Sequence, residues 1–359
     1  MAQTRCLALV TEAFGGRGGI AQYNRDFLEA LSGLFTRIDV VARHPGDPAL
    51  TPAGVFQTAP RGKLGYALRA LFAAARRPPD VVFCGHLHLA PLAAALARLL
   101  SATLILQAHG IEAWPRPKPF ERAAVERADL VLSVSRFTRS AILGWARIAP
   151  ERILVLPDTV ADAFGPADAS ALRSALGLEG KKVLLTVGRL DRRERYKGHD
   201  RVIDAIPELV DRGFDVVYLI AGEGDDRARL EERAQEKGIA PRVRFLGALP
   251  VSNLALVYRL ADLFVMPSTG EGFGIAYLES SASGVPALAL DRAGARDALA
   301  DGALGTLVEE RDLATAIARL LDAGKRNPEA LAERTRARFG RDVFRAQLRA
   351  QLARLSEPA

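Results

Sequence analysis

Short apolar runs that alternate with helical stretches constrain the fold of this 359-residue chain more than any other feature. Strands that are apolar on both faces are typical of parallel sheets covered by helices on both sides. The chain is therefore predicted to be an α/β protein with two doubly wound parallel sheets, one in each half. The runs of the first half are 6–11, 37–42, 80–84, 103–107, 130–134 and 152–156. Those of the second half are 182–187, 216–221, 243–246, 263–266, 287–290 and 305–308.

The length of the chain also favours two domains, because 359 residues exceed what one hydrophobic core usually supports. A segment with several Pro and Gly residues separates the two sets of strands between 157 and 182. We predict a first domain at 1–165 and a second domain at 166–339. An Arg- and Ala-rich helical run at 340–359 has no strand after it, and we expect it to pack on the first domain.

Composition is that of an ordinary globular protein, with 49% hydrophobic and 25% charged residues. Both cysteines lie in apolar runs, which favours core positions over a disulfide. The apolar stretch 89–108 contains Pro91 and Arg98, so a helix followed by a strand explains it better than a membrane span. The first five residues lead into a strand without a signal peptide, and we expect a cytoplasmic protein.

A net charge of +7 indicates an anionic partner, such as nucleic acid, anionic lipid or the phosphates of a sugar nucleotide. Nucleic acid is the weakest of these, because aromatic residues make up only 6% of the chain and no nucleic-acid-binding motif is present.

The run 61–77 is a candidate helix for peripheral binding to the inner face of an anionic membrane. If it is a crossover helix, its apolar stripe should face its own sheet, and we expect that orientation, with the cations outside. The cations are Arg61, Lys63, Arg69, Arg76 and Arg77, and the stripe is Leu64, Leu68, Leu71 and Phe72.

Glu271 and Glu279 lie on either side of a glycine-rich turn that follows a buried strand and opens a helix. Amides of a first helical turn are free to bind a ligand, and carboxylates accept hydrogen bonds from sugar and ribose hydroxyls. The alternative is an exposed pair at a helix start, a position that glutamates favour in any case. Gly272 and Gly274 beside Phe273 favour a binding site, since glycine lets a ligand approach the backbone.

Gly188 and Arg189 follow the first strand of the second half, and Lys197 comes shortly after. Arg offers a bidentate fork and Lys a compact charge, a combination that suits a diphosphate leaving group. Plain surface charge is the better explanation for the neighbouring Arg192, Arg193 and Arg195. We expect His199 to open the next helix rather than to act in chemistry.

Two features follow strands of the first half. The glycine cluster 15–19 precedes a helix but matches neither a dinucleotide fingerprint nor a P-loop, and a tight turn explains it almost as well as a phosphate cradle. His109 lies at a strand end, where we expect it to contact substrate, an expectation that is weaker for His86 and His88. Zinc-ligand spacing is absent from the sequence, and the acidic run 223–226 is better explained by helix capping, so we expect no metal.

Taken in order, these motifs resemble glycosyltransferase family 4 over nearly the whole chain. The resemblance implies a GT-B fold, in which two Rossmann-like domains face a central cleft, and sugar transfer from a nucleotide sugar with retention and without a metal or other cofactor. The motifs are the Gly-rich first turn, His109-Gly110, Ser133-Val134-Ser135, Gly188-Arg189, Lys197-Gly198, Gly222-Glu223-Gly224, Phe245-Leu246-Gly247 and Glu271-x7-Glu279.

The resemblance also implies roles for residues. Arg189 and Lys197 hold the donor diphosphate, Glu271 holds the transferred sugar, and Glu279 holds the ribose. His109 contacts the donor sugar near the reacting carbon. Implied further contacts to the donor come from Gly18, Gly19, Gly188, Gly222, Leu246, Gly272, Phe273 and Gly274. At 157–160 the chain has Pro-Asp-Thr-Val where relatives often have Pro-Asn-Gly-Val, which leaves the turn of the linker uncertain.

We therefore expect a hexosyltransferase acting on a glycan or lipid-linked acceptor in exopolysaccharide or glycolipid synthesis, with GDP-mannose favoured as donor and UDP-glucose next. A sugar-nucleotide epimerase of the same fold and a non-catalytic protein that binds polyanions are the alternatives. An NAD oxidoreductase is disfavoured, since no Gly-x-Gly-x-x-Gly follows a strand.

Overall fold

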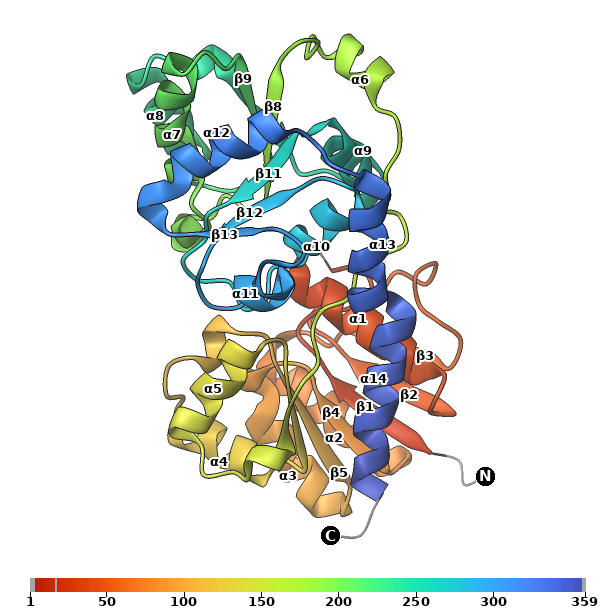
Figure 1. Ribbon diagram of the computed structural model, residues 1–359. Coiled ribbons are helices and arrows are strands. Elements are labelled where there is room, and N and C mark those ends of the chain that lie inside the picture. The colour runs from red at the N-terminus through yellow and green to blue at the C-terminus, as the bar shows by residue number, and fades with distance from the viewer. Residues whose placement is uncertain (1–3, 17, 357–359) are drawn as a thin grey trace. The chain divides into compact units, whose positions relative to one another are not determined.

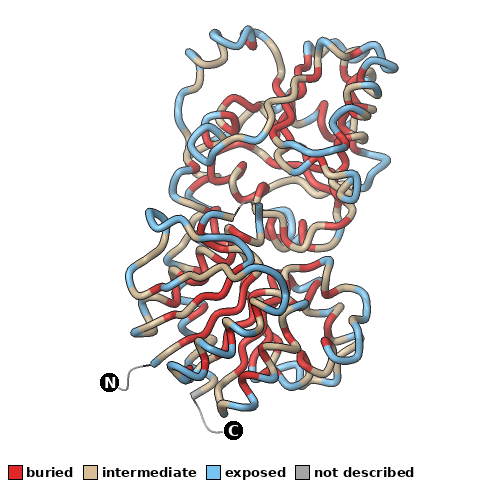
Figure 2. Tube along the Cα trace, turned by 180° about the vertical axis from the view of Figure 1, so that it is seen from behind, coloured by how far each residue is buried: buried red, intermediate tan, exposed pale blue. Residues whose placement is uncertain are grey.

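A computed structural model describes residues 4–16 and 18–356 (Figure 1). They form two compact units, and the first combines the chain up to Thr159 with the chain from Arg341 onward. The second unit is the continuous segment Val160–Gly340. In each unit the buried segments are concentrated in the strands (Figure 2).

The first unit contains a seven-stranded parallel sheet in the order β3-β2-β1-β4-β5-β6-β7. Its strands are β1 Arg5–Leu9, β2 Arg37–Val41, β3 Val55–Thr58, β4 Val81–Cys84, β5 Thr103–Ala108, β6 Leu130–Ser133 and β7 Ile153–Val155. Its helices are α1 Gly19–Ser32, α2 Gly62–Arg76, α3 Ala90–Leu100, α4 Pro119–Arg127, α5 Arg136–Trp145 and α14 Arg341–Ala353.

Helices cover both faces of this sheet. Val82 and Cys84 point to a core shared with α2, α3, α4 and α5. The intervening Phe83 points to the other face, because successive side chains of a strand alternate. There it stacks on Phe27 of α1, with 4.2 Å between ring centroids.

The second unit contains a six-stranded parallel sheet in the order β10-β9-β8-β11-β12-β13. One face packs against α7, α8 and α12 around Tyr218 and Val265, and on the other face Phe264 contacts the rings of Tyr258 and Tyr277. Its strands are β8 Lys182–Val187, β9 Val216–Ala221, β10 Val243–Gly247, β11 Leu263–Met266, β12 Ala287–Leu290 and β13 Thr306–Val308. Its helices are α6 Ser170–Ala175, α7 His199–Asp211, α8 Arg227–Glu236, α9 Val251–Leu260, α10 Ile275–Ala282, α11 Ala295–Ala298, α12 Leu313–Ala323 and α13 Pro328–Phe339.

The predicted pair of parallel sheets is confirmed, and every predicted strand is present to within two residues at each end. The strand β3 was not predicted. Its sequence, Val-Phe-Gln-Thr, is not a continuous apolar run, because β3 is an edge strand whose Phe56 is exposed.

The first boundary between the units lies after Thr159, not after residue 165 as the sequence predicted. Residues 160–165 are held by the second unit, since Val160 N donates to Phe339 O at 3.0 Å and Arg259 Nε donates to Gly165 O at 2.7 Å. The Arg336 guanidinium also donates to the carbonyl oxygen of Phe164.

The helical run after residue 339 forms α14, which lies along α1 in the first unit (Figure 1). Arg341 pairs with Asp26 at 3.2 Å, and Arg345 pairs with Glu29 at 2.9 Å. The buried Phe344 meets Tyr23 edge to face, with 5.9 Å between ring centroids.

The expected orientation of the 61–77 helix is wrong. In α2 the buried side chains are Tyr66, Ala70 and Ala74, whereas the apolar stripe is exposed. The Tyr66 hydroxyl lies 2.7 Å from Val41 O, and the small alanines let the helix approach the sheet on that side. Within the described part of the chain, no helix is both long and apolar enough to cross a membrane.

Replacing Phe344 with alanine should lower the free energy of unfolding of the first unit by roughly 3 to 5 kcal/mol, because a large buried ring leaves a cavity. Trp114 and Trp145 are the only two tryptophans and both belong to this unit, so their fluorescence in a urea titration reports on it. Arg349→Ala, an exposed position on the same helix, is the control and should change stability by less than about 0.5 kcal/mol. Equal effects of the two substitutions would show that α14 does not stabilise the unit.

Candidate active site

The carboxyl ends of β8, β9 and β11 bring three loops together in the second unit. The strand β8 pairs in parallel with both β9 and β11, so the segments that follow Val187, Ala221 and Met266 leave the same edge of the sheet. Ligands of open parallel sheets bind beyond this edge. Most of the predicted donor-binding residues of the second half follow these strands, and Leu246 lies at the carboxyl end of β10.

Two glycines let the loops approach one another. A Cβ at Gly222 would overlap the carbonyl oxygen of Gly188, and a Cβ at Gly198 would overlap that of Pro267. Both glycines also have positive φ angles, of 153° and 84°. Gly222 was predicted to bind the donor, and the structure gives it a packing reason to be glycine.

Four charged side chains meet at this edge. Lys197 Nζ lies 3.3 Å from Glu271 Oε1 and 3.8 Å from Glu194 Oε2, and Glu194 also pairs with the Arg189 guanidinium. The side chains of Lys197, Glu194 and Glu271 are nearly buried, whereas that of Arg189 is 69% exposed. Two cations and two carboxylates therefore balance, and the exposed Arg189 is the member that solvent or a ligand reaches most easily.

Glu194 was not singled out from the sequence, where its loop was interpreted as surface charge. Its position three residues before Lys197 was the available signal. In the short 3-10 segment Arg192–Lys197, which is kinked at Glu194, the two side chains come within 3.8 Å of each other.

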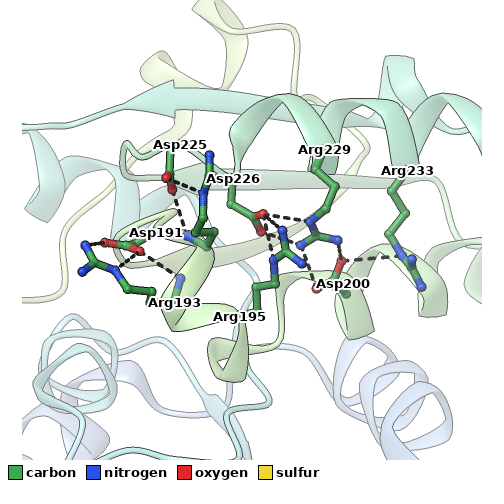
Figure 3. Close-up of polar contacts among 9 residues, drawn as sticks. Asp191, Arg193, Arg195, Asp200, Asp225, Asp226, Arg229 and Arg233 are labelled. Atoms are coloured by element: carbon green, nitrogen blue, oxygen red, sulfur yellow. Dashed lines mark hydrogen bonds and ion pairs between the residues drawn. The ribbon is translucent and has the colours of Figure 1, made fainter.

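An ion-pair network holds this helix on the second unit (Figure 3). Asp226, whose side chain is only 5% exposed, accepts from Arg195 Nε at 2.9 Å and from Arg229 Nε at 2.8 Å. Arg229 continues to Asp200 on α7, and the Arg192 backbone N donates to Asp225 at 2.9 Å. The hydrogen bonds from Arg229 and Arg195 hold the pKa of Asp226 below its usual range. Arg195 and Arg192, predicted to be plain surface charge, thus help to hold the loop that carries Lys197.

The turn between Glu271 and Glu279 begins α10. Gly294 N donates to Glu271 O at 3.0 Å and holds the start of the turn. Glu279 Oε2 accepts from the buried Tyr258 hydroxyl at 2.8 Å, and burial raises the pKa of Tyr258 well above its ordinary value. Phe273 is buried against Phe339, so its backbone amide, not its ring, is the part that can face a ligand.

Leu246 lies at the carboxyl end of β10, in a bulge between Phe245 and Gly247. Gly222 N donates to Gly247 O at 2.8 Å just beyond the bulge. The second unit therefore gathers Gly188, Arg189, Lys197, Gly222, Leu246, Glu271 and the start of α10 at one edge of its sheet.

His109 belongs to the first unit, where it follows β5. Its Nε2 lies 2.9 Å from the carbonyl oxygen of Gly85, and because a carbonyl only accepts, Nε2 carries the proton. Burial lowers the pKa of His109 below its ordinary value, which favours the neutral ring. The backbone N of His109 donates to Glu112 Oε1 at 2.6 Å, a contact that the sequence did not suggest.

The glycine cluster divides into two parts in the structure. Gly15 and Gly16 pack closely against backbone and side-chain atoms, whereas a Cβ at Gly18 or Gly19 would meet no atom within 4 Å. Gly18 precedes α1, which begins at Gly19. Arg17 lies outside the described residues.

His86 and His88 have local partners. Nδ1 of His86 accepts from His88 N at 3.2 Å, and His88 pairs with Glu121. His199 begins α7 as expected, and burial lowers its pKa to about 4. Among the described residues, no group of three or more His, Cys, Asp or Glu side chains is arranged to hold a metal ion.

The packing role of Gly222 can be tested by substitution with alanine. Overlap with the Gly188 carbonyl should destabilise the second unit by roughly 3 kcal/mol or more. The control is Gly238→Ala, where φ is also positive but a Cβ meets open space, and it should cost only about 1 to 2 kcal/mol. Thermal unfolding of both variants measures the difference, and a fully stable Gly222→Ala protein would refute the close approach.

Two family profiles match this chain. Glycosyltransferase Family 4 matches residues 17–163, and Glycosyl transferases group 1 matches residues 168–338. Together they account for most of both units.

Similar proteins include a GDP-mannose-dependent alpha-(1-6)-phosphatidylinositol monomannoside mannosyltransferase from Mycolicibacterium smegmatis, 36% identical over 65% of this chain and 65% of its own. A D-inositol 3-phosphate glycosyltransferase from Geodermatophilus obscurus is 37% identical over 60% of this chain and 50% of its own. The matches thus span less than two thirds of the length of these relatives.

Similar solved structures include HepE from Anabaena in complex with UDP, with a TM-score of 0.81 and 20% identity over 98% of this chain and 100% of that one. Sucrose-phosphate synthase from Thermosynechococcus elongatus has a TM-score of 0.78 and 22% identity over 98% of both chains. At such identities the likeness shows the fold alone. With a profile on each of its two parallel-sheet units, the chain belongs to glycosyltransferase family 4 and has the GT-B fold.

Proposed function

We propose that the protein transfers a hexose from a nucleotide sugar to a glycan or lipid-linked acceptor, with retention of configuration and without a metal ion. The observation that carries this proposal is the contact of Lys197 with Glu271 at the edge of the second sheet, beside Arg189. It joins a cation suited to phosphate with a carboxylate suited to sugar hydroxyls, in a family of sugar transferases.

In this proposal Arg189 and Lys197 bind the donor diphosphate and stabilise the charge that grows on it as the glycosidic bond breaks. Glu194 now pairs with both cations, so the diphosphate takes over contacts that this carboxylate makes in the free protein. In this proposal the two cations, and not a metal ion, stabilise the leaving group.

The transferred sugar lies against Glu271 and the amides at the start of α10. Glu279, next to the buried Tyr258 hydroxyl, binds the ribose. The remaining contacts to the donor come from Gly188, Gly222 and Leu246. The acceptor hydroxyl attacks the anomeric carbon from the face that the diphosphate leaves, and its proton passes to the leaving-group oxygen. Retention follows from attack and departure on the same face.

His109 and the open backbone at Gly18 and Gly19 are the proposed contacts of the first unit. Because Nε2 of His109 donates to Gly85 O, Nδ1 is the ring nitrogen that can accept from a sugar hydroxyl. The space beside Gly18 and Gly19 lets a phosphate or the acceptor approach the amides at the start of α1.

GDP-mannose remains the first choice of donor, in line with the mannosyltransferase from M. smegmatis. UDP-glucose is second, in line with the HepE structure that contains it. Inositol phosphate and phosphatidylinositol mannoside, which the names of relatives mention, are the first acceptors to test.

Thermal shift against GDP-, UDP- and ADP-sugars should identify one donor class that raises the melting temperature in proportion to the logarithm of its concentration over Kd. With that donor, release of free nucleotide should require an acceptor and should continue in EDTA. An epimerase would instead change the sugar without an acceptor. Loss of activity in EDTA that is restored by a divalent ion would refute metal independence.

Lys197→Ala should lower kcat by roughly two to three orders of magnitude, because a preorganised donor to the developing charge is lost. Glu279→Ala should act mainly on KM, since ribose contacts are much the same in the ground state and the transition state. Lys237→Ala, at the end of α8, is the matched control for loss of a lysine and should leave both constants unchanged. Wild-type turnover in the Lys197 variant would remove the diphosphate assignment.

A further inference from the structure

We propose that the outer side of α2, together with the cavity beside it, binds the surface of an anionic phospholipid membrane. This α2 face comprises Arg61, Leu64, Leu68, Leu71, Phe72 and Arg76, and the exposed Lys63 lies at the start of the same helix. This surface belongs to the first unit alone, and binding to it is independent of the proposed transferase activity.

The apolar stripe of the α2 face is open to solvent. Leu64 is 74% exposed, Leu68 56%, Phe72 54% and Leu71 42%. These large apolar side chains recur along one side of a single helix, and such continuous exposure is typical of an interaction site.

The stripe is fixed in this orientation by the opposite side of the helix. Tyr66 is buried, and its hydroxyl lies 2.7 Å from Val41 O and 3.0 Å from Val10 O. Ala70 and Ala74 are fully or almost fully buried against the sheet. Rotation of α2 to hide the leucines would break these contacts.

Charge on this helix has one sign. The segment 61–77 contains five Arg or Lys residues and no Asp or Glu. Among the residues that the structure describes, none of these five side chains forms an ion pair. Arg69 instead donates to Thr58 Oγ1 at 3.3 Å and lies over the ring of Phe72.

A cavity of about 590 Å³ adjoins the stripe and concentrates this charge. Arg69, Arg76 and Arg77 line it from α2, and its opposite wall is formed by β2 and β3. The carboxylate of Asp39 in that wall is already paired with Arg37 at 2.8 Å, so the three arginines of α2 remain in excess. Guanidinium groups bind phosphate oxygens, and the cavity therefore suits a phospholipid headgroup.

An anionic bilayer matches both parts of this surface, the apolar stripe and the cations beside it. Acyl chains accept the stripe, and headgroup phosphates meet the cations that flank it, which is how basic amphipathic helices bind in the interfacial layer. A protein partner would need an apolar groove one helix wide with acidic residues on both sides. The uniform sign of the charge and the cavity for a phosphate favour the membrane.

Co-sedimentation of the full chain with vesicles tests the proposal. Vesicles of phosphatidylcholine mixed with phosphatidylglycerol should bind the protein, and vesicles of phosphatidylcholine alone should bind it far less, with a difference that shrinks as salt rises. Exchanging chloride for inorganic phosphate at equal ionic strength should weaken binding only modestly, because the stripe still inserts.

Two double variants measure the contribution of the cations and that of the apolar stripe separately. Each cation near an anionic surface contributes roughly a factor of five in binding, so Lys63→Ser with Arg76→Ser should lower the partition coefficient roughly thirtyfold. Leu64→Ser with Leu68→Ser should lower it at least tenfold, as two exposed leucines no longer insert. Leu99→Ser and Arg311→Ser, both at highly exposed positions elsewhere, are the controls and should bind as the wild type does.

Equal binding to neutral and anionic vesicles, no binding to either, or equal binding by all variants would overturn the proposal. Sedimentation velocity without lipid supplies a further test. A dimer that dissociates in the Leu64→Ser, Leu68→Ser variant would assign the stripe to a second copy of the chain and would also overturn it.

Discussion

The parallel pairing of β8 with β9 on one side and β11 on the other is the constraint on which the candidate site depends. It brings together segments that are distant in the sequence, so that Lys197 and Glu271, 74 residues apart, lie within 3.3 Å. Only glycine at positions 198 and 222 leaves room for this approach. These glycines therefore act first on the packing of the loops, and any contact with a ligand depends on that packing.

In the absence of a ligand, the charge of Lys197 is balanced by neighbouring carboxylates. A nearly buried Lys197 with no anion beside it would lose hydration without compensation, which is costly in a protein interior. Glu194 and Glu271 supply the missing anions, and the ion pairs around Asp226 hold the short helix that carries Glu194. In the proposed function, an incoming diphosphate would replace contacts that these carboxylates make to the cations.

The sequence predicted every strand of both sheets except β3, because buried parallel strands are continuous apolar runs. It failed at β3, where one edge is exposed and the run is mixed, and at α2, where periodicity identified the leucine stripe but not the side that packs. The side that packs carries Tyr66, which hydrogen-bonds to the sheet, and two small alanines. Hydrophobicity measures neither hydrogen bonding nor small size. At the candidate site, the strand ends predicted Arg189, Lys197 and Glu271, which the structure brings close together. The contacts of Glu194 and Tyr258 are visible only in the folded chain.

The first unit is assembled from two separate stretches of chain, because α14 returns to it after the whole second unit has been completed. On a ribosome, residues 160–340 emerge before α14 exists, so the second unit can finish its core while the side of α1 that carries Tyr23 and Asp26 is still uncovered. The unit synthesised first is thus the last to be completed. Completion of the first unit therefore requires α14. A chain that stops before Arg341 would have a complete second unit and an incomplete first unit.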